Sequence, residues 1–303
     1  MTAQTTPPGP AARVGRGLAR AAALVVDLGR TWSGALGVTL VAIFLLVVVL
    51  APLVAPYGYA DQHIAARLQG PSDEFWLGTD HLGRDLLSRA IYGTRIAMLV
   101  ALPASLLALV VGLVLGLAAG FRGGRLDRAL VVVMDAMQSF PAVVLALALL
   151  MLLGRSLPNV VVVVAIAFAP AYARMARAST FVIREEAYIE AERSLGASNL
   201  RIVGTHVLPN VLPPLFILMA INIPVAVTVE AGLSFIGLGV PPPDPSWGVM
   251  LDEGFRRIQD TPWPVLVPAV TLMLSTLGFT FLGESLRDRL DPRLAGSRGG
   301  RGA

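Results

Sequence analysis

Long apolar runs dominate this sequence and restrict what it can fold into. Six of them approach the length that a helix needs to cross the hydrocarbon core of a bilayer, about 30 Å. The six runs are Leu36–Pro56, Ile96–Phe121, Ala129–Leu153, Val160–Arg177, Val211–Leu233 and Pro264–Leu282. Backbone polar groups at that depth must be paired within the segment, so each run is predicted to be a helix. The expected fold class is all-α, a polytopic integral membrane protein with about six transmembrane helices.

The basic residues of this chain limit its chemistry. All 24 are arginine, and 55% of the residues are hydrophobic against 15% that are charged, proportions typical of a membrane protein. A phosphate-binding P-loop requires a lysine, so any ATP with its Mg²⁺ is expected on another chain. The arginines flank the apolar runs instead of gathering on one face, which argues against nucleic-acid binding. Without cysteine, thiolate metal sites are also excluded.

The arginines also predict the orientation in the membrane. They are most frequent in the N-terminal segment, at residues 122–128, in the polar loop 184–209 and in the C-terminal tail. Because arginine-rich segments stay in the cytoplasm, both termini are predicted to be cytoplasmic. The apolar run Leu36–Pro56 is too long for a signal-peptide core, and we interpret it as a span that is not cleaved.

The organisation expected from these features has four parts. They are a flexible cytoplasmic N-terminus (1–30), a first transmembrane helix with an extracytoplasmic segment (31–95), a five-helix transmembrane core with the cytoplasmic loop 184–209 (96–285), and a cytoplasmic tail (286–303). In the extracytoplasmic segment, Asp80 can cap a helix. The apolar positions from Leu82 to Ile91 recur every three or four residues, which predicts an amphipathic helix on the outer membrane surface.

The polar loop 184–209 is the most informative segment for function. Glu185 and Glu186 stand where a short helix begins and suit its dipole. Gly196 allows a sharp turn, and Ser198 can cap a second short helix. A loop that only reversed the chain would need far fewer residues. The sequence therefore predicts a compact two-helix knob that docks in a groove on a partner protein.

The spacing in this loop resembles the coupling-loop signature of ABC-importer permeases. That signature is Glu-Ala-Ala, three residues, Gly, nine residues, Ile, one residue and Leu-Pro. This sequence keeps the spacing but has Glu192 in place of the second Ala and His206 in place of Ile. The resemblance implies that the loop docks on a separate ATPase through a defined set of residues. These are Glu190, Ala191, Glu192, Gly196, His206, Leu208 and Pro209.

Further stretches resemble one group within these permeases. They are Trp76–Asp85 (WLGTDHLGRD), Glu230–Gly239 (EAGLSFIGLG) and Pro245–Gly248 (PSWG). Together with the tail Leu286–Leu294, they are similar to the C-type subunit of the dipeptide/oligopeptide/nickel permease family. The resemblance covers residues 30–294 and implies the type I ABC importer permease fold.

Membership of that family would make this chain one subunit of a larger machine. The partners implied are a sister permease in a heterodimer, two cytoplasmic ABC ATPases, an extracytoplasmic solute-binding protein and membrane lipid. ATP and Mg²⁺ would be bound by the ATPases, so this chain would hold no cofactor and catalyse no bond chemistry. The location implied is the inner membrane of a bacterium.

Some polar residues have two interpretations from the sequence. Asp135 and Glu230 lie inside apolar runs, where an ionisable group is costly and often functional. They either contact the transported solute or act structurally by bonding the backbone of broken helices. A second set either contacts the binding protein or the sister subunit, or belongs to an ordinary helix surface. This set is Asp80, Arg84, Asp85 and Trp247.

The remaining question is the cargo. His63, His81 and His206 show no ligand-like spacing, so no metal site is expected in this chain. The expected function is that of a transmembrane permease subunit of an ATP-driven importer for di- and oligopeptides, forming half of the pathway. Two alternatives stay open: a nickel or other small-solute importer of the same family, and a proton-coupled secondary transporter with Asp135 and Glu230 as its relay.

Overall fold

The computed structural model describes residues 27–290, and the regular structure within them is helical. The helices are α2 (Trp32–Val54), a 3-10 turn (Ile64–Ala66), α3 (Leu86–Arg122), α4 (Gly124–Gln138), α5 (Ala142–Leu153), α6 (Leu157–Arg184), α7 (Ala187–Ser194), α8 (Asn199–Ile202), a π-helical turn (Val203–Val207), α9 (Leu208–Phe235), α10 (Trp247–Phe255) and α11 (Trp263–Leu290). The all-α fold class predicted from the sequence is confirmed.

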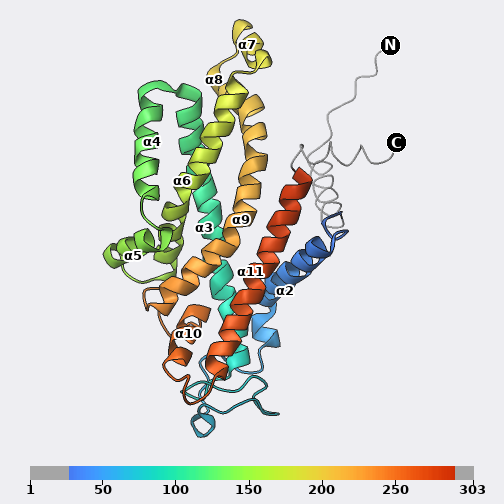
Figure 1. The fold of residues 1–303 in the computed structure, drawn as a ribbon, viewed down its shortest axis with the longest axis vertical. Helices are drawn as coiled ribbons and strands as arrows, with labels where there is room; N and C mark the ends of the chain where they lie inside the picture. Colours follow the sequence, from blue (N-terminus) through green and yellow to red (C-terminus); the bar gives the residue numbers. More distant parts are fainter. Residues whose placement is uncertain (1–26, 291–303) are drawn as a thin grey trace.

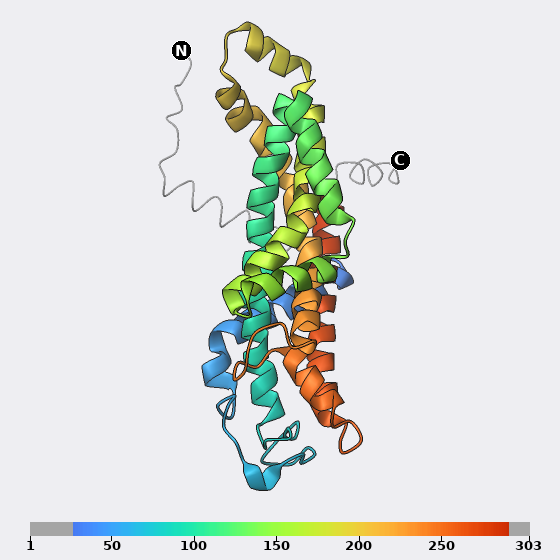
Figure 2. The same ribbon diagram turned by 90° about the vertical axis from the view of Figure 1, so that its left-hand side faces the viewer.

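The helices form an elongated bundle with two distinct ends (Figure 1). One end, the loop end, carries α7 and α8. The opposite end, the cap end, carries α10 and the segment 55–85 between α2 and α3. Figure 2 shows the same elongated shape after a quarter turn. This arrangement separates the two groups of candidate site residues by the full length of the bundle.

The predicted spans lie in helices of membrane-crossing length, with one exception. Five helices are long and apolar enough to cross a bilayer, and a sixth span exists only if the bent pair α4 and α5 is one span. The expected continuous run Ala129–Leu153 is broken, because its two helices meet at 93°. Pro141 lacks an amide hydrogen, and the Ser139 hydroxyl bonds the carbonyl of Asp135 at the end of α4. As a result α5 lies across the bundle (Figures 1 and 2).

Helices α3 and α6 form the most extensive helix pair in the described part of the chain. Their contact depends on Gly112, Gly116 and Gly120, which repeat every fourth residue along one face of α3. A Cβ atom on these glycines would lie between 2.4 and 2.7 Å from atoms of α6. Small residues at this spacing allow close backbone approach, which drives helix association where apolar burial from water does not. The four-residue spacing of these glycines is visible in the sequence itself.

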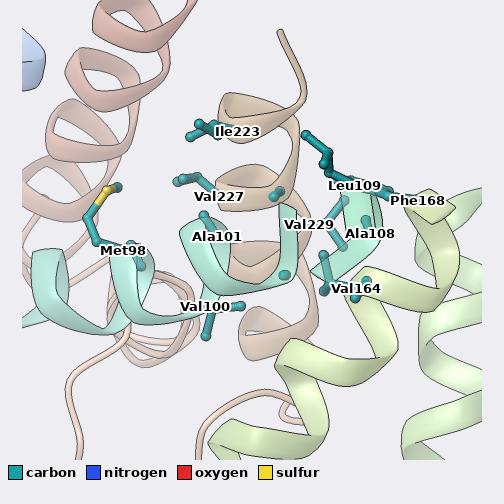
Figure 3. Close-up of a cluster of buried hydrophobic side chains, with 14 of the residues drawn as sticks. Met98, Val100, Ala101, Ala108, Leu109, Val164, Phe168, Ile223, Val227 and Val229 are labelled. Carbon is teal, nitrogen blue, oxygen red and sulfur yellow. The ribbon is translucent and has the colours of Figure 1, made fainter. Parts of the chain in front are cut away.

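The centre of the bundle is an apolar junction of α3, α6 and α9 (Figure 3). Ala101 from α3, Val164 from α6 and Val227 from α9 are each fully buried there. The junction is built mainly from aliphatic, aromatic and methionine side chains and acts as close-packed support, although the polar residue Ser105 is also fully buried on the same stretch of α3.

The expected amphipathic helix on the membrane surface is absent from the described residues. Helix α3 begins at Leu86, where Asp85 and not Asp80 is the N-cap, and it continues without a break to Arg122. At 1.5 Å per residue its 37 residues extend about 55 Å, longer than the bilayer core. Of the apolar residues that suggested a separate helix, Leu82 precedes α3, whereas Leu86 and Ala90 are buried in its first turns. The expected division between residues 95 and 96 thus falls inside one helix.

The N-terminal residues that the structure describes pack against α11. Leu28 is buried, and the carboxylate of Asp27 is paired with Arg289, whose guanidinium also bonds the Asp27 backbone carbonyl at 2.8 Å. Asp27 and Leu28, within the segment expected to be flexible, are therefore packed, and residues 286–290 of the expected tail continue α11. Segments 1–26 and 291–303, with the rest of those expectations, lie outside the described residues.

Candidate functional site

The polar loop 184–209 folds into the two short helices that the sequence predicts. Helix α7 follows Glu186, and helix α8 is capped by the Ser198 hydroxyl, which accepts a bond from the amide of Arg201 at 3.4 Å. Between them Gly196 has φ of +82°, in the left-handed region that glycine adopts without strain. A π-helical turn then joins α8 to α9, which opens with Leu208 and Pro209.

Three apolar side chains fasten this loop to the bundle. Ile189 of α7, Ile202 of α8 and Val207 of the π-helical turn are fully buried in the main hydrophobic core. The guanidinium of Arg193 also lies 5.6 Å from the ring centroid of Phe121 on α3. These contacts hold the loop in a defined position, so it is an ordered knob at the loop end of the bundle.

The outer surface of the knob is unusually apolar at its tips. Leu195 and Leu200 are 84% and 85% exposed, and Tyr188 is 42% exposed. Glu190 and Ala191 are exposed as well, and no atom of the described chain lies within 4 Å of a Cβ placed on Gly196. Exposed apolar side chains held on an ordered scaffold mark an interaction surface. This geometry suits docking into a groove on another protein.

The two departures from the coupling-loop signature lie next to each other. Glu192 of α7 places its Oε1 atom 3.5 Å from Nε2 of His206 in the π-helical turn. The His206 ring is also 5.7 Å from the ring of Tyr188. The spacing of 14 positions in the sequence gives no sign of this contact. We therefore interpret the two exchanges as one paired change, because the two side chains are in contact and link α7 to the π-helical turn before α9.

At the cap end, a buried cluster joins segment 55–85 to α3 and α10. The Arg84 guanidinium bonds Asp80 at 2.5 Å and Glu253 at 2.8 Å. The Arg89 guanidinium lies 3.0 Å from the same Glu253 oxygen and 3.5 Å from Asp80. Arg84 is 6% and Arg89 1% exposed. Sequence reasoning missed Arg89 and Glu253, because nothing in the sequence pairs residues 164 positions apart.

The other cap residues named from the sequence are equally internal. Asp85 accepts hydrogen bonds from the amide and hydroxyl of Ser88, both at 2.7 Å, and so caps α3. The indole of Trp247 donates to the carbonyl of Ala90 at 3.0 Å. Asp80, Arg84, Asp85 and Trp247 are each at most 6% exposed. The geometry therefore favours an internal role for these four residues over direct contact with a partner or an ordinary helix surface.

Glu230 and Asp135 occupy different environments. Glu230 is fully buried, and its Oε1 atom accepts hydrogen bonds from Ser234 at 2.7 Å and from Ser246 at 2.8 Å. Because Ser246 also caps α10, this carboxyl ties the cap to α9. Asp135 instead pairs with Arg174 of α6 at 2.9 Å, with both side chains more than half exposed. The two carboxyl groups share no partner among the described residues, which weakens the hypothesis of a proton relay.

One group of ligand-type side chains occurs at the cap end. Ligand atoms of Asp80, His81 and Glu253 lie within 4.8 Å of one another. Glu253 already accepts hydrogen bonds from Arg84 and Arg89, and Asp80 accepts one from Arg84, so a bound cation would sit beside two guanidinium groups. That neighbourhood is electrostatically unfavourable for a metal ion. We therefore interpret the group as an internal ion-pair network.

Comparison with known proteins identifies the family. Residues 112–296 match the family described as binding-protein-dependent transport system inner membrane component, and residues 32–71 match the N-terminal TM domain of oligopeptide transport permease C. The dipeptide transport system permease protein DppC of Alkalihalophilus pseudofirmus is 39% identical over 85% of both chains. The glutathione transport system permease protein GsiD of Escherichia coli is 37% identical over 84% of this chain and 85% of its own.

Solved structures agree on the fold. An inward-facing structure of the MetNI methionine ABC transporter matches with a TM-score of 0.53 and 21% identity, over 68% of this chain and 96% of that chain. The ABC importer permease fold predicted from the sequence is confirmed. Members of this family are multi-pass inner-membrane proteins that work with an ATPase and other components. The chain belongs to the family of binding-protein-dependent transport system inner membrane components, the permeases of ABC importers.

Proposed function

We propose that this chain is one of two different permease subunits in an ATP-driven importer of di- and oligopeptides. It forms half of the pathway and couples to a separate ATPase through the knob at residues 184–209. The main support for the coupling role is that Leu195 and Leu200 are exposed on a scaffold that is anchored to the bundle. The peptide cargo is supported by the relatives, whose names include dipeptide, peptide and glutathione permeases.

The knob would transmit the ATPase cycle in the following way. The outward leucines and the exposed residues Glu190 and Ala191 lie in a groove on one of two cytoplasmic ATPases, which bind the ATP and Mg²⁺. When the ATPases close on ATP, the groove moves and carries α7 and α8 with it. The buried anchors Ile189, Ile202 and Val207 pass this motion to the bundle, because close-packed side chains transmit displacement. The bundle then alternates access to the pathway.

The orientation that follows places the loop end in the cytoplasm and the cap end outside. Both termini are then cytoplasmic, in agreement with the arginine-rich segments of the sequence. An extracytoplasmic solute-binding protein would deliver peptide at the cap end. The buried cluster of Asp80, Arg84, Arg89 and Glu253 would keep that docking platform rigid without touching the binding protein itself.

Membrane lipid and the sister permease would cover the sides of the bundle. Helix α2 exposes Leu46, Val49 and Leu53, which are 59%, 74% and 82% exposed and suit contact with acyl chains. A face of this composition carries no polar group that would need water. We therefore assign the outer face of α2 to lipid and leave the polar faces of α9 and α11 for the pathway.

The test uses two substitutions at Gly196 in the assembled transporter. Gly196→Val strains the backbone at positive φ by roughly 1–2 kcal/mol and adds bulk where a partner would lie. Gly196→Asn is the control, because asparagine tolerates this conformation. ATP-driven peptide uptake into vesicles and co-purification of the ATPase are measured. Loss of both with valine and retention with asparagine supports docking, whereas normal uptake with valine contradicts it.

A further inference from the structure

A groove lined by both polar and apolar side chains runs between α9 and α11 on the outside of the bundle. Its volume is about 530 Å³. The lining residues from α9 are Ile221, Pro224, Val225 and Thr228, and those from α11 are Thr276, Thr280, Glu284 and Arg287. Five of these eight side chains carry a hydroxyl, a carboxylate or a guanidinium. The groove is therefore unlike the rest of the spanning surface described above.

A second groove shows what a lipid-facing hollow in this molecule looks like. It lies between α3, α4 and α6, has a volume of about 300 Å³, and is lined by side chains such as Leu107, Val133 and Met137 with no polar group. An acyl chain can occupy such a hollow at no cost in unpaired polar atoms. In the α9–α11 groove Thr228, Thr280, Glu284 and Arg287 are exposed. Polar side chains at membrane depth face water or protein, not hydrocarbon.

The threonines bring hydrogen-bonding capacity deep into the span. Thr276 lies near the middle of α11, and its hydroxyl donates to the carbonyl of Leu272 at 3.0 Å. The hydroxyl of Thr228 donates to the carbonyl of Pro224 at 2.9 Å. A hydroxyl whose proton is engaged in this way still has lone pairs that accept hydrogen bonds. The threonine hydroxyls that line the groove can therefore accept hydrogen bonds from the amide hydrogens of a passing solute.

The charges lie at the mouth of the groove toward the loop end. Glu284 and Arg287 are three residues apart on α11, so their side chains are neighbours on one helix face. Neither takes part in an ion pair with another residue of the described segment 27–290. A carboxylate and a guanidinium one turn apart complement a solute that carries an ammonium group at one end and a carboxylate at the other.

We propose that the α9–α11 groove is the part of the solute path that this chain provides, and that Glu284 and Arg287 bind the two charged termini of a dipeptide as it leaves. Glu284 accepts from the terminal ammonium, and Arg287 donates to the terminal carboxylate. The threonines accept from peptide amides on the way. The assignment rests on the proposed function, and it names the zwitterionic termini as the chemistry that this chain recognises.

The experiment measures ATP-driven uptake by the complete transporter reconstituted in vesicles. Each solute is supplied already bound to the solute-binding protein, so that the selectivity of that protein is held constant. The solutes are a free dipeptide, its N-acetylated form and its C-amidated form. The variants are Glu284→Gln, Arg287→Gln and Thr276→Val. The matched controls are Asp288→Asn, an exposed carboxylate nearby that does not line the groove, and Thr271→Val, whose hydroxyl makes the same type of bond to Val267 at 2.8 Å.

The inference makes distinct predictions for these variants. Loss of one charge-assisted hydrogen bond predicts roughly a tenfold loss in uptake of the free dipeptide. Glu284→Gln should lose the preference for a free amino terminus, and Arg287→Gln the preference for a free carboxylate. Thr276→Val should lower the uptake of all three solutes, and both controls should match the unmodified complex.

Three outcomes would overturn the proposal in different ways. If the unmodified complex hydrolyses ATP but takes up no peptide, the proposed function fails and the inference fails with it. If peptide uptake is normal in the unmodified complex and unchanged in Glu284→Gln and Arg287→Gln, the inference alone fails. If these variants no longer co-purify with the sister permease, the groove is a subunit contact and does not line the path.

Discussion

At the loop end Leu195 and Leu200 lie outside, 84% and 85% exposed, whereas at the cap end Arg84 and Arg89 lie inside, 6% and 1% exposed. The ordinary distribution of apolar and charged side chains is reversed at both ends. Each reversal has its own physical meaning. An apolar tip on a fixed scaffold is a surface that another protein completes. A buried ion-pair cluster is already complete, and it fixes the relative position of the elements that it joins.

The difference predicts opposite consequences of mutation at the two ends. Changes at the cap end should lower stability, because they leave charges or hydroxyls buried without partners. Changes at the loop end should leave stability unchanged and weaken association with the ATPase.

The largest effect is expected for Arg89→Met at the cap end. It removes a guanidinium that lies beside both Glu253 and Asp80 and leaves those carboxylates with fewer partners. Breaking a buried pair in this way costs about 3–5 kcal/mol. Thermal unfolding of the purified chain in detergent measures the loss. The control is Arg256→Met at the C-cap of α10, whose pair with Asp252 is exposed and should contribute less than about 1 kcal/mol. Equal shifts for the two variants would contradict a special role for the buried cluster.

A smaller loss of stability is expected for Glu230→Ala. The hydroxyls of Ser234 and Ser246 would lose a buried acceptor, at a cost of about 1–3 kcal/mol. Glu230→Gln keeps a carbonyl oxygen at the same place and should recover most of the stability. If peptide uptake fell in Glu230→Gln while its thermal stability stayed normal, Glu230 would have a functional role that this structure does not indicate.

At the loop end, Leu200→Asp should leave thermal stability within about 0.5 kcal/mol of the parent, because the side chain is exposed. Burial of this leucine in a partner groove predicts at least a tenfold weaker association with the ATPase. Quantitative co-purification of the ATPase measures it. Asn199→Asp adds the same charge at the neighbouring position without removing apolar surface, and it should associate nearly normally. Equal behaviour of the two variants would attribute the effect to charge and not to apolar docking.

The smallest effect is expected for the pair formed by Glu192 and His206. Glu192→Ala restores the residue of the coupling-loop signature and removes a half-exposed contact, so the stability should change by no more than about 0.5 kcal/mol. If the two exchanges act together, the effects of Glu192→Ala and His206→Ile on ATPase association should not add up in the double variant. A double-mutant cycle on that association measures the coupling. Strict additivity would mean that the two positions are independent.

The two-helix fold of the loop 184–209 could be predicted in detail because its determinants are local. The cap that begins α8 at Ser198 and the positive φ at Gly196 depend on neighbours within a few residues. The same holds for most spans, since an apolar run of sufficient length pairs its backbone only as a helix. The prediction of one continuous span at Ala129–Leu153 was wrong for a local reason as well. Pro141 interrupts the hydrogen-bond ladder, and hydropathy alone does not register that break.

Apolar length, caps and signature spacing are local features, and they suffice to predict the class of fold, most spans and the two-helix loop 184–209. The packed bundle places Arg84 and Trp247 inside, because their partners Glu253 and Ala90 lie far away along the chain. It alone brought Glu192 to His206 and aligned α9 with α11 into a groove lined by both polar and apolar side chains. The reason is physical: burial and charge pairing depend on which helix faces meet. That follows from packing over the whole bundle, not from any local pattern of residues.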